Sequence, residues 1–283
     1  MVKLKLLFVE GWMLMNTKIN FLKKSSYRFI LLFLFCISLC KIPCMATATL
    51  DTTKTDWWLV RAKNHEIPGF NTKLGYKLED YGGYCLGDTS RKVVYLTFDE
   101  GYENGYTSKI LDVLKAHDVK AMFFVTLPYL EKNTDLIKRM HDEGHLVCNH
   151  TNHHLSMPTL VDNEEKFNAE ITSVATAYEK ITGSPIPKFF RPPMGHYSQK
   201  SLAMTKALGY RTIFWSFAYG DWKPEAQPEP SSARKLMLDG LHNGAIYLLH
   251  AVSKTNTEVL GDFITEARKM GYTFELLPSE ESQ

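Results

Sequence analysis

Residues 93–101 read Val93-Val94-Tyr95-Leu96-Thr97-Phe98-Asp99-Glu100-Gly101, an apolar run that ends in two adjacent carboxylates. A continuous apolar run of this length, rich in Val and aromatic residues, predicts a strand buried on both faces, as in a parallel sheet. Asp99 and Glu100 stand where that strand leaves the core, and Gly101 permits a turn directly after them. Polar side chains at such a point are candidates for chemistry.

Further apolar runs follow this strand, and stretches with helical periodicity separate them. The runs are 121–126, 146–148, 189–190, 212–217, 245–249 and 272–277, and the helical stretches are 107–116, 134–143, 163–181, 198–208 and 255–270. Short strands that alternate with amphipathic helices predict an α/β fold with a mainly parallel sheet. Periodicity alone leaves two architectures open, an open doubly wound sheet and a closed barrel.

The positions of the polar motifs favour the barrel. The candidates fall at or just after the carboxyl ends of predicted strands, and they are Asp99, His150, Arg191, Asp221 and His250. In a (β/α) barrel these ends surround a single mouth, where ligand chemistry concentrates. An open sheet would spread the same residues along a line.

Residues 1–48 are interpreted as a signal peptide, so we expect a protein that is exported across the cytoplasmic membrane. Basic residues precede the apolar run 29–40, and Ala46-Thr47-Ala48 has the small-x-small pattern of a cleavage site. The run is shorter than the roughly 20 residues that span a bilayer comfortably. A retained signal anchor is the alternative, and Met15 is a second possible start.

Composition narrows the class of partner. The chain has 33 Lys and Arg against 31 Asp and Glu, and seven of the basic residues but one acidic residue lie before residue 49. The exported part is therefore mildly acidic, which argues against a nucleic-acid partner. Cys85 and Cys148 could form a disulfide, but no spacing rule connects them, and two free thiols are the preferred interpretation.

Residues 49–90 are predicted to form an arm packed on a catalytic domain at 91–280. The arm is rich in aromatic residues, Gly and turn formers and has no sustained period. Trp57 and Trp58 are interpreted as packing residues, with the lining of a glycan groove as the alternative, because sugars stack on aromatic faces.

His150 and His154 have a His-x-x-x-His spacing, which in helical geometry brings two imidazoles to one face. The spacing alone is a weak signal, since His141 and His145 repeat it around Gly144 and are interpreted as surface residues. A nearby carboxylate strengthens the first pair. Two His and one carboxylate leave an open position for water, as in catalytic zinc sites.

The other candidates are individually ordinary. Asp99 and Glu100 can serve one site only if the chain has already turned, because adjacent strand residues face opposite ways; a solvated carboxylate pair is the alternative. Arg191 precedes Pro192 and Pro193, which fix the backbone and can aim an amide N–H. A structural role is the ordinary alternative for this Arg and for a lone His after a strand, such as His250.

Taken together, these motifs resemble the polysaccharide deacetylases of the NodB-homology group, carbohydrate esterases of family 4 with a distorted (β/α) barrel. Five family motifs occur in order over about residues 91–277. They are Thr97 to Gly101, His150 to His154, Arg191 to Pro193, Asp221-Trp222 and Leu248 to His250.

The resemblance implies a role for each matched residue. Asp99 would be the general base, oriented by Arg191, and His250 the general acid, tuned by Asp221. The Met194 N–H would bind the oxyanion. Pro193, Tyr102 and Trp222 are assigned to the substrate-binding surface. A divalent metal, zinc first with cobalt or manganese as alternatives, would be held by His150, His154 and Glu100.

One position departs from the family motif, which has Asp where this chain has Glu100. The extra methylene moves the carboxylate outward and puts direct ligation by Glu100 in question. A narrower resemblance, carried by Gly101 to Gly105, Phe214 to Ser216, Asp221 to Lys223 and the arm with Trp57-Trp58, is to sporulation delta-lactam-biosynthetic de-N-acetylases. That group tolerates a residue other than Asp at this position.

The narrower resemblance implies hydrolysis of the N-acetyl group of N-acetylmuramic acid in peptidoglycan glycan strands, which leads to muramic δ-lactam in spore cortex. No protein partner is inferred. Two alternatives stay open. One is a deacetylase for another exported polymer, with N-acetylglucosamine or chitin-like units, and the other is a catalytically silent glycan-binding barrel.

Overall fold

The computed structural model describes residues 49–61, 63–70 and 74–279, so the signal-peptide prediction for 1–48 lies outside the described residues. The main sheet has the order β11-β5-β6-β7-β8-β10-β4, with β12 beside β5, and its ladders are parallel. Its strands are β4 (Gly83–Tyr84), β5 (Val93–Glu100), β6 (Met122–Val125), β7 (Leu146–Asn149), β8 (Phe189–Phe190), β10 (Arg211–Ile213), β11 (Ala245–His250) and β12 (Thr273–Phe274). The predicted α/β class with a distorted barrel is confirmed.

The distortion lies at one seam. No ladder joins β4 to β11 among the described residues, and two isolated bridges, Leu86 with Ala245 and Phe217 with Tyr247, span this side instead. The sheet therefore curls into an incomplete ring. The carboxyl ends of its strands still meet around one mouth, as the distribution of polar motifs predicted.

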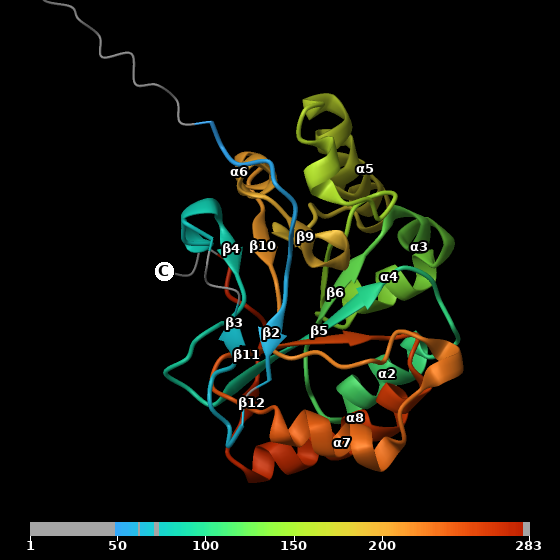
Figure 1. The fold of residues 1–283 in the computed structure, drawn as a ribbon. Helices are drawn as coiled ribbons and strands as arrows, with labels where there is room; N and C mark the ends of the chain where they lie inside the picture. The colour runs from blue at the N-terminus through green and yellow to red at the C-terminus, as the bar shows by residue number, and fades with distance from the viewer. Residues whose placement is uncertain (1–48, 62, 71–73, 280–283) are drawn as a thin grey trace, which may run out of the picture. The chain divides into compact units, whose positions relative to one another are not determined.

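Helices cover the outside of the curled sheet (Figure 1). α7 packs on α8 and α8 on α2, while α5 packs on α3 and α4. The bounds are α2 (Thr107–Ala116), α3 (Leu127–Lys132), α4 (Thr134–Asp142), α5 (Glu164–Thr182), α6 (Gln199–Ala207), α7 (Pro230–Asp239) and α8 (Lys254–Lys269). None of the described helices is both long and apolar enough to cross a membrane.

Strand β5 separates two cores. Leu96 and Phe98 belong to the large cluster under the helices, whereas Val93 and Tyr95 belong to a smaller cluster inside the ring. Successive side chains of a strand point to opposite faces, so the odd positions face the ring and the even positions face the helices. This alternation decides where the two carboxylates at the end of β5 lie.

The arm is tied to the barrel at several places. β1 (Thr55–Asp56) pairs antiparallel with β9 (His196–Tyr197), and β2 (Leu59–Val60) pairs with β3 (Gly69–Phe70). Trp57 is buried and stacks on Phe214, with the ring centroids 4.6 Å apart. Its interpretation as a packing residue is confirmed. Trp58 is half-exposed and does not line the main cavity.

Several elements were not predicted. α7 begins at Pro230, which is favourable at the first helical position but reads as a breaker in the sequence. α3 is only six residues long, and β4 is a two-residue strand within the irregular arm. Cys85 and Cys148 are free thiols, as preferred from the sequence.

Candidate active site

Asp99 and Arg191 form a buried ion pair inside the ring. Arg191 follows β8 and is fully buried; its Nη1 donates to the Asp99 Oδ1 at 2.7 Å and to the Thr97 Oγ1 at 2.8 Å. The guanidinium also lies over the Phe124 ring at 4.1 Å. Burial alone would raise the pKa of Asp99, but the charges of Arg191 and two nearby histidines lower it below its usual value. Asp99 is thus held as a carboxylate, the form a general base needs.

His150 lies on the other side of Asp99. Its Nδ1 hydrogen-bonds the carbonyl oxygen of Arg191 at 2.8 Å, and its Nε2 lies 3.6 Å from the Asp99 Oδ2. Burial lowers the pKa of His150 to about 4, against the opposing charge of Asp99. The ring is therefore neutral at pH 7, and the bond at Nδ1 leaves Nε2 facing Asp99.

His154 approaches His150 through a loop, not through the helix that its spacing suggested. The two ring centroids are 5.0 Å apart, and residues 150–154 contain no helix. Thr151 and His154 both have left-handed backbone angles, with φ of 71° and 55°. Such angles are strained for residues other than Gly and persist only where the surroundings hold them.

Two residues that the sequence did not reveal hold this loop. The Thr151 N–H donates to the Asn149 Oδ1 at 3.0 Å, and the buried Glu170 of α5 accepts from the His153 N–H at 2.8 Å. The second Glu170 oxygen lies 2.7 Å from the His153 Nδ1. Two features of the sequence could have indicated these residues: Asn149 stands next to the predicted ligand His150, and Glu170 is an acid on the apolar side of a helical stretch.

His250 and Asp221 form a second pair. In the parallel ladder His250 is directly opposite Asp99, which places both at the same height in the mouth. The buried Asp221 lies 2.7 Å from the His250 Nδ1 and also accepts from the His250 N–H at 2.8 Å. Burial alone would lower the pKa of His250, but the charge and hydrogen bond of Asp221 raise it above its usual value.

Met194 stands in a tight turn at the cavity wall. It has a φ of 58° between Pro193 and Gly195, and half of its surface is exposed. A Cβ on Gly195 would lie 2.9 Å from Trp215 and 3.0 Å from Trp57, so only Gly fits. Pro193 is buried and does not line the cavity. Its assignment to the substrate surface is wrong; it shapes the turn from beneath.

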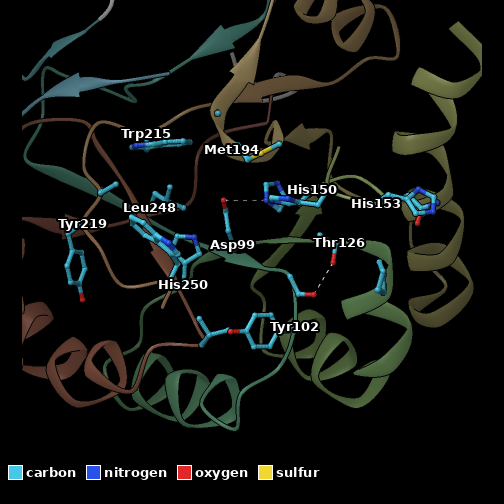
Figure 2. A pocket seen from close by; sticks show the side chains of 18 residues that line it. Asp99, Tyr102, Thr126, His150, His153, Met194, Trp215, Tyr219, Leu248 and His250 are labelled. Atoms are coloured by element: carbon cyan, nitrogen blue, oxygen red, sulfur yellow. Dashed lines mark hydrogen bonds and ion pairs between the residues drawn. The ribbon is translucent and has the colours of Figure 1, made fainter. Parts of the chain in front are cut away.

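These groups surround one cavity of about 850 Å³. Figure 2 shows Asp99, His150 and His250 converging on it from the ends of different strands, while His153, which also lines it, lies farther from them. Tyr102 and Trp222 are about half-exposed and line the cavity, and the Trp222 ring lies 6.2 Å from that of His250. A wide mouth with exposed aromatic rings suits a sugar chain better than a small molecule.

Glu100 is not part of this cavity, which corrects the predicted ligand set. β5 continues through Glu100 before the chain turns, so its side chain faces the helices and is fully buried there. Neither carboxylate oxygen has a hydrogen-bond partner in the described part of the chain. Burial and the charges of Glu103 and Asp99 raise the pKa of Glu100 well above its usual value. Its surroundings therefore favour the protonated, neutral form.

The metal prediction does not fit the arrangement as a three-ligand site. In the described ranges no three His, Cys, Asp or Glu side chains converge closely enough to hold a metal ion. The predicted set places His150 and His154 together, but its third member lies across the sheet. The prediction that His145 lies at the surface is wrong. This residue is buried, and its Nδ1 accepts from the Ala121 N–H at 3.1 Å.

The fold and site together describe a (β/α) barrel with a carboxylate and an imidazole at its mouth, an arrangement suited to hydrolysis, and comparison with known proteins assigns the family. The family described as polysaccharide deacetylase matches residues 86–213. A peptidoglycan-N-acetylmuramic acid deacetylase of Bacillus subtilis, PdaA, is 46% identical over 219 residues, which cover 77% of this chain and 82% of the relative. A peptidoglycan-N-acetylglucosamine deacetylase of Bacillus cereus is 30% identical over 71% of this chain and 73% of its own length.

A solved structure gives the same assignment. The structure of B. subtilis PdaA, a family 4 carbohydrate esterase, superposes with a TM-score of 0.77 at 44% sequence identity. The match covers 80% of this chain and 96% of the PdaA chain. The chain therefore belongs to the polysaccharide deacetylase family, whose members are family 4 carbohydrate esterases. The resemblance stated from the five motifs is confirmed.

Proposed function

We propose that this protein hydrolyses the N-acetyl group of N-acetylmuramic acid residues in peptidoglycan. The observation that carries the chemistry is that Asp99 and His250 are neighbours in the β5–β11 ladder and line one cavity, with pKa values shifted in opposite directions. Groups whose environments separate their pKa values in this way serve as base and acid. The substrate class rests on the 46% identity to PdaA of B. subtilis.

In the proposed reaction Asp99 takes a proton from the water that attacks the amide carbonyl. The Met194 N–H is assigned to the oxyanion of the tetrahedral intermediate. His250, protonated and held by Asp221, then gives a proton to the leaving nitrogen as the C–N bond breaks. Acetate and a free amine on the sugar are the products. Arg191 keeps Asp99 in place throughout.

Each of these steps uses only residues of the chain. Zinc, with cobalt or manganese as alternatives, stays a prediction for the imidazoles of His150 and His154, without Glu100. The chemistry such an ion supplies is polarisation of water or carbonyl oxygen.

The proposal extends to the fate of the deacetylated sugar and to the place where the enzyme acts. In muramic acid the freed amine and the lactyl carboxyl are on the same sugar, so their condensation with loss of water gives the δ-lactam of spore cortex. This requires an exported enzyme, in agreement with the leader expected from residues 1–48. The N-acetylglucosamine of vegetative wall is the alternative substrate, favoured by the 30% identity to the B. cereus relative.

The test is acetate release by the purified protein from three substrates: peptide-stripped glycan strands, intact peptidoglycan and chitin oligomers. We expect release from the stripped strands, with new free amines on muramic acid identified by mass spectrometry of the digested sugars. Free amines on glucosamine alone would assign the alternative substrate. No acetate from any of the three would contradict the proposal.

A further inference from the structure

Asn256 lies on the first turn of α8 and is fully buried beside the Asp221–His250 pair. It belongs to none of the motifs described above. Its Nδ2 donates to the Asp221 Oδ2 at 2.7 Å and to the His250 carbonyl oxygen at 3.0 Å. Its Oδ1 accepts from the Tyr219 hydroxyl. Three partners thus fix which way the amide points.

This arrangement leaves Asp221 with no freedom to rotate. One carboxylate oxygen receives the His250 Nδ1, and the other receives two donors, the His250 N–H and the Asn256 Nδ2. A carboxylate that accepts along both oxygens is held in one plane, and the imidazole bonded to it is held with it. Nδ1 of His250 is then committed to Asp221, and Nε2 is the nitrogen left for the cavity.

Asn256 is itself placed by the start of its helix. The Ser253 Oγ caps α8 by accepting from the Asn256 N–H at 3.0 Å. Gln227 connects the same region to the Asp221 loop, because its Nε2 donates to the Asp221 carbonyl oxygen at 2.9 Å while its Oε1 accepts from the Ser253 Oγ. The helix start and the loop that bears Asp221 therefore form one hydrogen-bonded unit.

We infer that Asn256 is a positioning residue that acts through Asp221 to hold His250 in the tautomer and orientation required of the general acid. The inference rests on the proposed function for His250. The Tyr219 ring, which lines the cavity, connects the same amide to the substrate side.

A double-mutant cycle tests this role. Asn256→Ala should lower kcat about 10-fold with KM changed less than 2-fold, since no substrate contact is lost. In an Asp221→Asn background the same change should lower kcat less than 2-fold, because the carboxylate on which Asn256 acts is already gone. Equal losses in both backgrounds would overturn the inference. Glu258→Ala, an exposed change on the same helix, should leave kcat unaltered.

A readout without substrate separates this inference from the proposed function. In the wild-type protein the ¹⁵N signals of the neutral His250 imidazole should show one tautomer with the proton on Nδ1, and in Asn256→Ala a mixture. An unchanged tautomer in a variant that is still folded by thermal unfolding would overturn the inference. If the expected mixture is seen but the wild-type protein releases no acetate, the proposed function fails while the positioning role stands.

Discussion

Asp99 and Glu100 are consecutive residues of one strand, yet their carboxylates lie on opposite sides of the sheet and have opposite pKa shifts. Asp99 is ion-paired with Arg191 inside the ring, whereas Glu100 is buried under the helices with no hydrogen-bond partner in the described chain. The first is held as an anion and the second as a neutral acid. The amide variants Asp99→Asn and Glu100→Gln can therefore distinguish an effect on catalysis from an effect on stability.

Asp99→Asn should lower the rate of acetate release by about 100-fold or more, since positioned acid–base groups contribute roughly 10²–10⁴-fold. Glu100→Gln is the matched control: it makes the same carboxyl-to-amide change one residue further on and should keep at least half of the activity. Initial rates on glycan strands measure both. An active Asp99→Asn protein would remove Asp99 as the base.

Glu100→Gln should also stabilise the protein at alkaline pH. The folded pKa of Glu100 is raised, so the folded state binds the proton more tightly than the unfolded state. The contribution of Glu100 to stability is therefore present below its unfolded pKa, about 4.3, and is lost as pH rises toward the folded pKa. Urea unfolding at pH 5 and pH 8 should show a difference between variant and wild type that grows with pH. A constant difference would mean that Glu100 is not a neutral acid.

Asp221→Asn should move the alkaline limit of activity to lower pH. The Asp221 charge and hydrogen bond raise the pKa of His250, and without them burial lowers it. Because the general acid must be protonated, activity falls as pH passes the His250 pKa from below. The pH profile of kcat should show this limit shifted downward in the variant, and an unshifted limit would assign it to another group.

Metal analysis tests separately whether the protein binds zinc and which side chains are its ligands. We expect bound zinc in the wild-type protein and the same zinc content in Glu100→Gln, because that side chain faces away from the histidines. His154→Ala should lose the ion, and a chelator should lower activity that zinc then restores. A wild-type protein without metal would remove the zinc prediction, and loss of metal in Glu100→Gln would place Glu100 back among the ligands.

Gly195→Ala should destabilise the protein and slow catalysis, since its Cβ would meet Trp215 and Trp57 beneath the Met194 turn. Gly183→Ala is the control for backbone strain alone. It has a similar φ, +73° against +66°, at the end of α5, but among the residues that the structure describes nothing lies within 4 Å of its Cβ. The control should lose about 1–2 kcal/mol of unfolding free energy and keep its activity. Equal effects of the two changes would show that the turn tolerates the contact.

Much of the fold could be predicted because parallel strands buried on both faces leave continuous apolar runs. β5 was predicted from Val93 onward, and α2 was predicted with its observed bounds, Thr107–Ala116. The elements that were missed carry weaker signals: α7 begins with a proline, and β4 depends on pairing with β10 rather than on its own two residues.

The site was predictable where a side chain ends a strand, because strand ends meet in a barrel. Asp99, His150 and His250 come together for this reason. The placement of Glu100 failed because Gly101 was expected to turn the chain earlier than it does, and one position along an unbroken strand reverses the face. Asn256 and Glu170 reach the site from helices, and a contact between distant elements leaves no local pattern in the sequence.

The contacts of Trp57 make the N-terminal arm part of the catalytic domain. Its N–H donates to the Gly195 carbonyl oxygen at 2.9 Å and its Nε1 to that of Trp215 at 3.0 Å, so the arm supports the turn that carries Met194 from below. The family match begins only at residue 86. The smallest piece that could be exchanged with a relative, or inherited as a working unit, therefore begins before Thr55. A graft cut at the family boundary would leave the Met194 turn without the support of Trp57.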